Sequence, residues 1–226
     1  LWNQKKKISR NLKFIYKTKN KNTHSVAIFN SNIREQIISY NPDLLILHWL
    51  GNELISLKDL DSLKIPKVWV LHDMWPYCGA EHYTTSERFI EGYNPTNRPD
   101  YEKGFDLNKW VFERKKKYLD KNIKIIATSN WQLDNSKKSF LLKQNKILKI
   151  PLPINTNFWK PFNKLEARKI LGWEKDKTYF LFGFSDISKR FIKGLDITLK
   201  LFQNFNLVNK RSKLNIFGHL LNFREK

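Results

Sequence analysis

The sequence predicts an α/β protein built on parallel sheets, and two observations carry this prediction. From about residue 25 onward, short apolar runs typical of buried strands alternate with segments whose apolar residues recur at helical spacing. A connector with three prolines in eleven residues, 151–161, then interrupts the alternation, and a second alternation begins after it. We therefore expect two domains, residues 1–152 and residues 153–226, with the second one incomplete.

The first domain is expected to hold four strands, at 43–48, 67–72, 123–128 and 147–150. Within the run 43–48, residues 44–47 are apolar without interruption, which is typical of a strand buried on both faces of a parallel sheet. One helix is expected around Ile33, Ile37 and Ile38, which are spaced to lie on one helical face. Further helices are expected over 53–63, 107–120 and 131–142. The long segment 73–106 is irregular and contains three glycines and three prolines. Segments of this length are usually functional or mobile.

The second domain is expected to begin with a helix over 164–171 and a strand over 179–182. A helix starting at Gly194 and a strand over 214–217 follow. Because strand and helix alternate here as well, we expect parallel strands with right-handed crossovers.

The composition is strongly basic, with 42 Lys and Arg against 21 Asp and Glu, a formal net charge of +21. Three interpretations compete: a solvated Lys-rich surface, attraction to an anionic membrane face, and nucleic-acid binding. No RNP, zinc-finger or KH pattern is present, so we expect no nucleic acid. The single cysteine, Cys78, excludes an internal disulfide and favours a reducing compartment. The longest apolar run, 44–50, is interrupted by His48 and is far shorter than the ~20 residues of a membrane span.

Candidate site residues follow two of the predicted strands. His48-Trp49 ends the first strand, and His72-Asp73 ends the second. Ligands of open parallel sheets bind at the carboxyl ends of the strands. One strand-terminal histidine is often only a structural hydrogen-bonding group, but two at equivalent places favour a binding edge. Metal-ligand spacings such as Cys-x-x-Cys are absent, so we expect no metal site, and nothing pairs Cys78 with a histidine as a nucleophile.

A second candidate site precedes the helix expected at Gly194. Lys193 stands directly before it, and Arg190 lies in the polar, basic loop upstream. Free N–H groups at a helix N-terminus together with nearby cations suit a phosphate. A solvated helix start is the alternative interpretation of the same residues.

Four passages of the chain are similar to family 4 glycosyltransferases of bacterial polysaccharide synthesis, including the colanic-acid and lipopolysaccharide type. They are Asn41–Gly51, Val68–Tyr83, Ala127–Trp131, and Ile150–Pro161 followed by Lys193–Asp196. Their order and spacing agree over nearly all of 24–218. The resemblance implies a GT-B fold, which consists of two Rossmann-like parallel-sheet domains with the acceptor on the first domain and the donor nucleotide on the second.

The resemblance also implies a function. We expect a metal-independent, retaining transfer of a sugar from a nucleotide-sugar donor to a saccharide or lipid-linked acceptor, with no cofactor. It implies catalytic roles for His72 and Lys193. The donor side would comprise Arg190, Lys193 and Gly194, and the acceptor side His48, Trp49, Asp73 and His82. We expect a cytoplasmic protein with a peripheral contact at the inner face of an anionic membrane.

The chain departs from the family pattern in ways that keep alternatives open. Leu152-Pro153 replace an Asn-Gly pair, and the loop before Lys193 is longer, so Arg190 replaces the donor-phosphate arginine only by its proximity. The chain starts at Leu1 and ends before the family's acidic E-x7-E motif, so we expect a piece truncated at both ends. The alternatives are a catalytically inactive fragment of the transferase and a basic α/β module that binds nucleic acid or anionic membrane.

Overall fold

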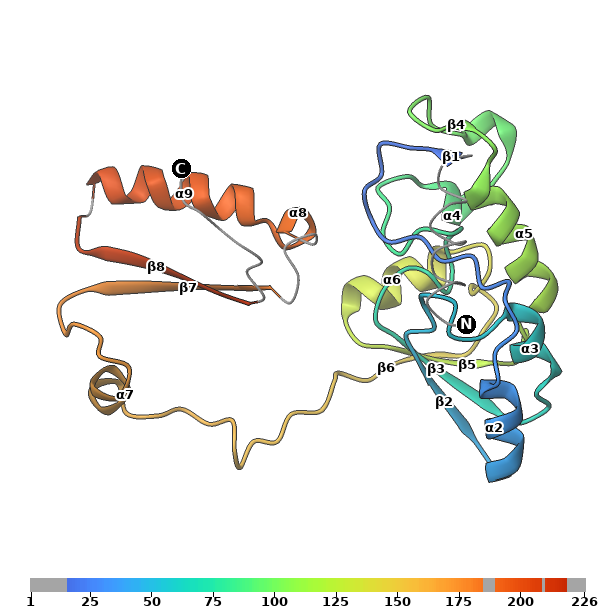
Figure 1. Ribbon diagram of the computed structural model, residues 1–226, viewed down its shortest axis with the longest axis horizontal. Coiled ribbons are helices and arrows are strands. Elements are labelled where there is room, and N and C mark those ends of the chain that lie inside the picture. Colours follow the sequence, from blue (N-terminus) through green and yellow to red (C-terminus); the bar gives the residue numbers. More distant parts are fainter. Residues whose placement is uncertain (1–15, 185–189, 209, 219–226) are drawn as a thin grey trace. The chain divides into compact units, whose positions relative to one another are not determined.

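The computed structural model describes residues 16–184, 190–208 and 210–218. The chain divides into two compact units, Leu1–Pro153 and Ile154–Lys226, here called unit 1 and unit 2. Figure 1 follows the elements of each unit along the chain.

Unit 1 is built on a four-stranded parallel sheet in the order β2-β3-β5-β6. Parallel neighbours require crossovers, and helices supply them here. The α/β class predicted from the sequence is therefore confirmed for this unit. The strands are β2 (Leu45–His48), β3 (Lys67–Leu71), β5 (Lys124–Ala127) and β6 (Ile147–Lys149), and the helices between and before them include α2 (Ile33–Tyr40), α3 (Leu57–Ser62), α5 (Leu107–Tyr118) and α6 (Asn130–Lys138).

The core of unit 1 contains several large aromatic side chains. Trp69 on β3 and Trp75 after it are both buried, with ring centroids 6.0 Å apart. Tyr77 and Phe112 are buried in the same cluster, together with Leu71. Burying one large apolar side chain stabilises a fold by about 1.5–3 kcal/mol, so these rings fix the end of β3 and the chain that follows it.

The irregular segment after β3 is held by buried polar contacts. It contains α4 (Arg88–Glu91), the 3₁₀ helix η2 (Pro95–Asn97) and β4 (Lys103–Gly104), which pairs antiparallel with β1 (Tyr16–Lys17). The buried Arg88 guanidinium donates to Glu102 at 3.2 Å and to Asp106 at 2.6 Å. From α5, the buried Lys115 ammonium donates to the carbonyl oxygens of Trp75, Cys78 and Gly79. The segment is thereby anchored to the body of unit 1.

A second anchor is the buried carboxylate of Glu53, which accepts hydrogen bonds from backbone amides of residues 26–28, ahead of β2 in the chain. Glu53 accepts from the N–H groups of Val26 and Ala27 through Oε1, at 2.9 and 3.1 Å, and from Ile28 through Oε2 at 3.1 Å. Ala27 and Glu53 both have positive φ angles, of 49° and 59°. Such angles are uncommon in residues other than glycine and persist only where surrounding contacts enforce them. The carboxylate therefore fixes the course of the chain at 26–28.

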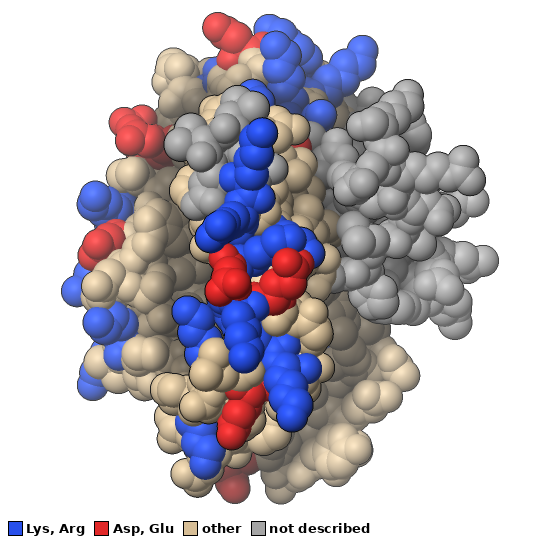
Figure 2. Space-filling view, turned by 90° about the vertical axis from the view of Figure 1, so that its left-hand side faces the viewer, with Lys and Arg blue, Asp and Glu red and all other residues tan. Residues whose placement is uncertain are grey.

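Unit 2 contains two parallel strands, β7 (Thr178–Phe184) and β8 (Ser212–Gly218), in register along their whole length. Its helices are α7 (Lys164–Ile170), α8 (Arg190–Lys193) and α9 (Leu195–Val208). A Cβ atom at Gly183 would lie 2.2 Å from the ring of Phe217, so glycine is required where the ring crosses the neighbouring strand. On the face in Figure 2, Lys and Arg side chains gather around fewer acidic ones. In unit 2, Glu174 pairs with Lys177 and Lys213.

The structure corrects several details of the predicted elements. The strand β2 is not buried on both faces, because it lies at the edge of the sheet and Ile46 is 58% exposed. The helix expected from residue 53 begins at Leu57, because Ser56 caps it by accepting from Asp59 N–H. The helix expected from Gly194 begins at Leu195, because Gly194 has a left-handed φ of 76° that separates α8 from α9.

Candidate functional site

The two strand-terminal histidines meet at the carboxyl edge of the unit 1 sheet. His48 is the last residue of β2, and His72 directly follows β3. The parallel register sets His48 opposite Val70, which brings both side chains to the same edge. The Nδ1 atom of His48 lies 2.8 Å from Nε2 of His72, and both residues are exposed.

This contact determines what the neutral pair offers to a ligand. Each neutral imidazole carries one proton, and one of the two protons lies between the rings. Whichever ring donates it, the other ring carries its proton on its outward nitrogen. The pair therefore presents one outward N–H and one outward lone pair, which suits a sugar hydroxyl or a phosphate oxygen beside a hydroxyl.

Two further hydrogen bonds fix the backbone beneath His72. The Tyr83 hydroxyl donates to the carbonyl oxygen of His72 at 3.2 Å. The Thr128 hydroxyl, which follows β5, donates to the carbonyl oxygen of Leu71 at 3.0 Å. Thr128, at the polar end of β5, therefore stabilises the backbone at this edge of the sheet.

Behind the pair lies a buried relay of three side chains. His82 Nδ1 lies 2.5 Å from Asp73 Oδ2, and His82 Nε2 lies 2.8 Å from Ser25 Oγ. Because a carboxylate only accepts, Nδ1 carries the proton, and in the neutral ring Nε2 accepts from the Ser25 hydroxyl. Ser25 Oγ also accepts from Asn52 N–H at 3.0 Å, and Asp73 Oδ1 accepts from Trp75 N–H at 3.1 Å.

This order of serine, histidine and aspartate is the one used by nucleophilic hydrolases. Here it cannot attack a substrate, because Ser25 is fully buried and its oxygen is already held by a backbone amide. The relay instead fixes Asp73, whose neighbour in the chain is His72. Its role is therefore to position the edge.

The relay also supports Trp49. The indole lies against the His82 ring, with centroids 5.6 Å apart, and Trp49 keeps 40% of its surface exposed. Gly51 makes this fit possible, because a Cβ atom there would lie 2.6 Å from Trp49 Cζ2 and 2.8 Å from His82 Cε1. An exposed aromatic face beside the histidine pair is a surface on which an apolar ring face can stack.

The four residues expected on the acceptor side therefore fall into two groups, one exposed and one buried. His48 and Trp49 are exposed at the edge, as a binding role requires. Asp73 and His82 are 5% and 2% exposed, so they support the edge from beneath and do not line it. This corrects the expectation for these two residues, and the reason is that the chain after β3 turns into the core.

The donor-side residues lie in unit 2. Lys193 ends α8 and is exposed, and Gly194 follows it with its left-handed φ. Arg190 begins α8, but its side chain lies outside the described residues. A contact between His72 of unit 1 and Lys193 of unit 2 stays a prediction.

Sequence reasoning missed Ser25 and the buried ionisable groups around the segment after β3. Burial lowers the pKa of Lys115 to about 7 and raises that of Glu81 to about 7. Tyr93 donates to Glu81 Oε1 at 2.5 Å. The available signal for Lys115 was its place four residues after the buried Val111 on the same face of α5. Burial raises the pKa of the Cys78 thiol, which makes it a poor nucleophile.

Among residues 16–184, 190–208 and 210–218, no group of three or more His, Cys, Asp or Glu side chains is arranged to hold a metal ion. Within the same ranges, no helix is both long and apolar enough to cross a bilayer. Compared with protein-family models and with curated proteins, the chain gives no match.

Proposed function

We propose that the protein is a retaining, metal-independent glycosyltransferase that moves a sugar from a nucleotide-sugar donor to a saccharide or lipid-linked saccharide in cell-surface polysaccharide synthesis. The resemblance of its four sequence passages supplies the reaction class. The hydrogen-bonded His48–His72 pair at an exposed sheet edge is the observation that supports it best, because the pair offers a donor and an acceptor together. In this proposal, unit 1 and unit 2 are the acceptor and donor domains of a GT-B enzyme.

The transfer breaks the bond between the anomeric carbon and the diphosphate oxygen and forms one between that carbon and an acceptor hydroxyl oxygen, whose proton passes to the leaving diphosphate. The leaving diphosphate gains negative charge while the sugar becomes cationic. Positive groups and N–H donors aimed at that diphosphate lower the barrier. We assign this role to Lys193 and the outward N–H of the histidine pair, with Arg190 and Gly194 on the donor side.

On the acceptor side, Trp49 stacks against the apolar face of a pyranose ring, and His48 holds a hydroxyl next to it. The lipid-linked acceptor and the net charge of +21 support a peripheral contact with the cytoplasmic face of an anionic membrane. Membrane contact of this kind needs no spanning helix.

The test is binding and transfer with UDP-, GDP- and dTDP-sugars on the full chain. We expect His72→Ala to lower transfer about 100-fold, because removing one preorganised hydrogen-bond donor to developing negative charge costs about 10²–10³-fold in kcat. Trp49→Ala is expected to raise the acceptor KM more than it lowers kcat. The matched control is Tyr40→Ala, which removes an 83% exposed aromatic residue at the end of α2, before β2 begins.

Two results would overturn the proposal. The first is that no nucleotide sugar binds, while DNA or anionic vesicles bind with a steep dependence on salt concentration, which favours the basic binding module. The second is that transfer occurs but His72→Ala is as active as the unsubstituted protein.

A further inference from the structure

A separate hollow of about 400 Å³ lies at the amino-terminal ends of the unit 1 strands, at the edge of the sheet opposite to the His48–His72 pair. One wall is the end of α5 and the chain that leads into β5, and the other is the segment between α6 and β6. Both walls precede their strands, whereas His48 and His72 lie at the strand ends. The length of a four-residue strand, about 13 Å, therefore separates the two edges. The residues that line the hollow are Lys115, Lys116, Leu119, Asp120, Lys121, Phe140, Leu141, Leu142, Lys143, Gln144 and Asn145.

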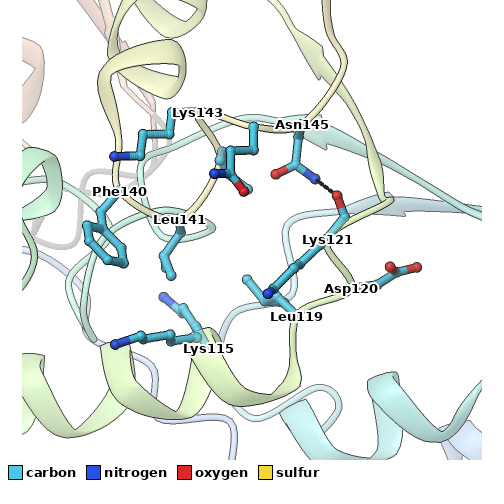
Figure 3. Close-up of a pocket in the computed structure, with 11 residues that line it drawn as sticks. Lys115, Leu119, Asp120, Lys121, Phe140, Leu141, Lys143 and Asn145 are labelled. Atoms are coloured by element: carbon cyan, nitrogen blue, oxygen red, sulfur yellow. Dashed lines mark hydrogen bonds between the residues drawn. The ribbon is translucent and has the colours of Figure 1, made fainter.

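The hollow is preformed, because its two walls are tied together. Asn145 donates from Nδ2 to the carbonyl oxygens of Lys121 at 2.9 Å and of Ile123 at 3.0 Å. Figure 3 shows the first of these bonds beside the opening, and Leu141 pointing between the walls. Phe140 N–H donates to Phe89 O at 2.8 Å, which fixes the second wall to the body of unit 1.

Cations gather around this hollow. The ammonium groups of Lys116 and Lys143 lie 5.6 and 5.2 Å from the centroid of the Phe140 ring. Lys121 lines the hollow from the other wall. Within the described parts of the chain, neither Lys121 nor Lys143 forms an ion pair, and Lys116 has only a 3.9 Å contact with Glu113. The carboxylate of Asp120, the one acid in the lining, points away from Phe140 and Leu141 in Figure 3.

The floor of the same hollow is apolar. Leu119, Phe140 and Leu141 are half-buried there, and Leu142 is fully buried. A ligand that satisfies both parts needs an anionic group for the lysines and a short apolar chain for the leucines. An anionic group without a chain leaves the floor wet, and a chain without charge leaves the lysines unpaired.

We propose that this hollow binds a phosphate ester that carries an apolar chain. The phosphate lies between Lys116, Lys121 and Lys143, and the chain lies on Leu119 and Leu141. Free alkyl phosphates and the headgroup region of an anionic phospholipid share this chemistry. The site is independent of the transfer reaction proposed above, because it lies at the other edge of the sheet.

The test is titration of the full chain with butyl, hexyl and octyl phosphate, followed by calorimetry. We expect the affinity to rise about fourfold per methylene that enters the hollow. The variant Lys116→Gln/Lys121→Gln/Lys143→Gln is expected to lose at least tenfold in octyl phosphate affinity. The matched control, Lys58→Gln/Lys137→Gln/Lys138→Gln, removes the same charge from exposed positions outside the hollow and is expected to stay within twofold.

Equal losses in the two triple variants would overturn the proposal, because they would show attraction to net charge alone. An affinity that does not change with chain length would overturn it as well. Vesicles with and without phosphatidylglycerol identify the source of the ligand: competition between octyl phosphate and the anionic vesicles points to a lipid, and octyl phosphate binding without vesicle binding points to a free phosphate ester. Neither readout requires glycosyl transfer, so a failure here leaves the proposed function untouched.

Discussion

The buried Lys115 gives the sharpest prediction about unit 1, which concerns how its stability changes with pH. Burial lowers the pKa of this ammonium from 10.5 to about 7. Between these pH values the unfolded chain holds a proton that the folded chain lacks. The free energy of unfolding therefore rises with pH through this window, by up to about 1.4 kcal/mol per pH unit.

Lys115→Met removes the titrating group and keeps most of the volume. It also removes the donor for three buried carbonyl groups and the ammonium that lies 3.9 Å from the Trp75 ring centroid. We expect the variant to be destabilised by several kcal/mol, as for other broken buried polar networks. The pH dependence is the diagnostic quantity, because it does not depend on the size of that loss.

The measurement is urea unfolding at pH 7.5 and 8.5, with tryptophan fluorescence as the signal. This interval lies below the ordinary pKa values of Cys78, Tyr77 and Tyr93, and burial raises the pKa values of all three groups further in the fold. We expect the unsubstituted chain to gain about 1 kcal/mol more than Lys115→Met across the interval. Equal gains would refute the reasoning, because they would mean that the carbonyl groups and the indole keep Lys115 charged in the folded state.

Two further predictions concern Glu81 and Gly51. The pKa of Glu81 is raised from 4.5 to about 7 by burial, so the folded state holds the extra proton between these values. Stability therefore falls as pH rises from 5 to 6.5, by about 1 kcal/mol per unit, and Glu81→Gln should flatten this dependence in urea unfolding. Gly51→Ala should destabilise unit 1 by about 1–3 kcal/mol, because its Cβ meets Trp49 and His82, and thermal unfolding with near-UV circular dichroism should show both the loss and a displaced indole. An unchanged melting temperature would contradict that packing.

Elements whose pattern is local could be predicted from the sequence. The strands around Leu47 and Val70 were predicted from their apolar runs alone, and the parallel rule then brought His48 and His72 to one edge. What the rule could not give was the direct contact between the two rings. That contact depends on the register of the strand pair and on the side-chain conformations.

The contacts that join distant parts of the chain could not be predicted from the sequence. Ser25 and His82 are 57 residues apart, and their bond depends on how the irregular chain after β3 folds back into the core. Glu53 looked like part of a helix, yet it turns inward to meet the amides of 26–28. In both cases a buried polar group selects the conformation, and its partner carries no periodic signal.

The carboxylate of Glu53 has a consequence for any anion that approaches the 26–28 segment. Successive backbone N–H groups of this kind form cradles that hold phosphate in many proteins. In this chain the Glu53 carboxylate occupies the cradle. Because this carboxylate belongs to the same chain, diluting the protein does not release it. A dianion would have to displace Glu53 from the buried interior before it could bind there. These amides therefore stabilise the fold, and charged substrates bind at other surfaces.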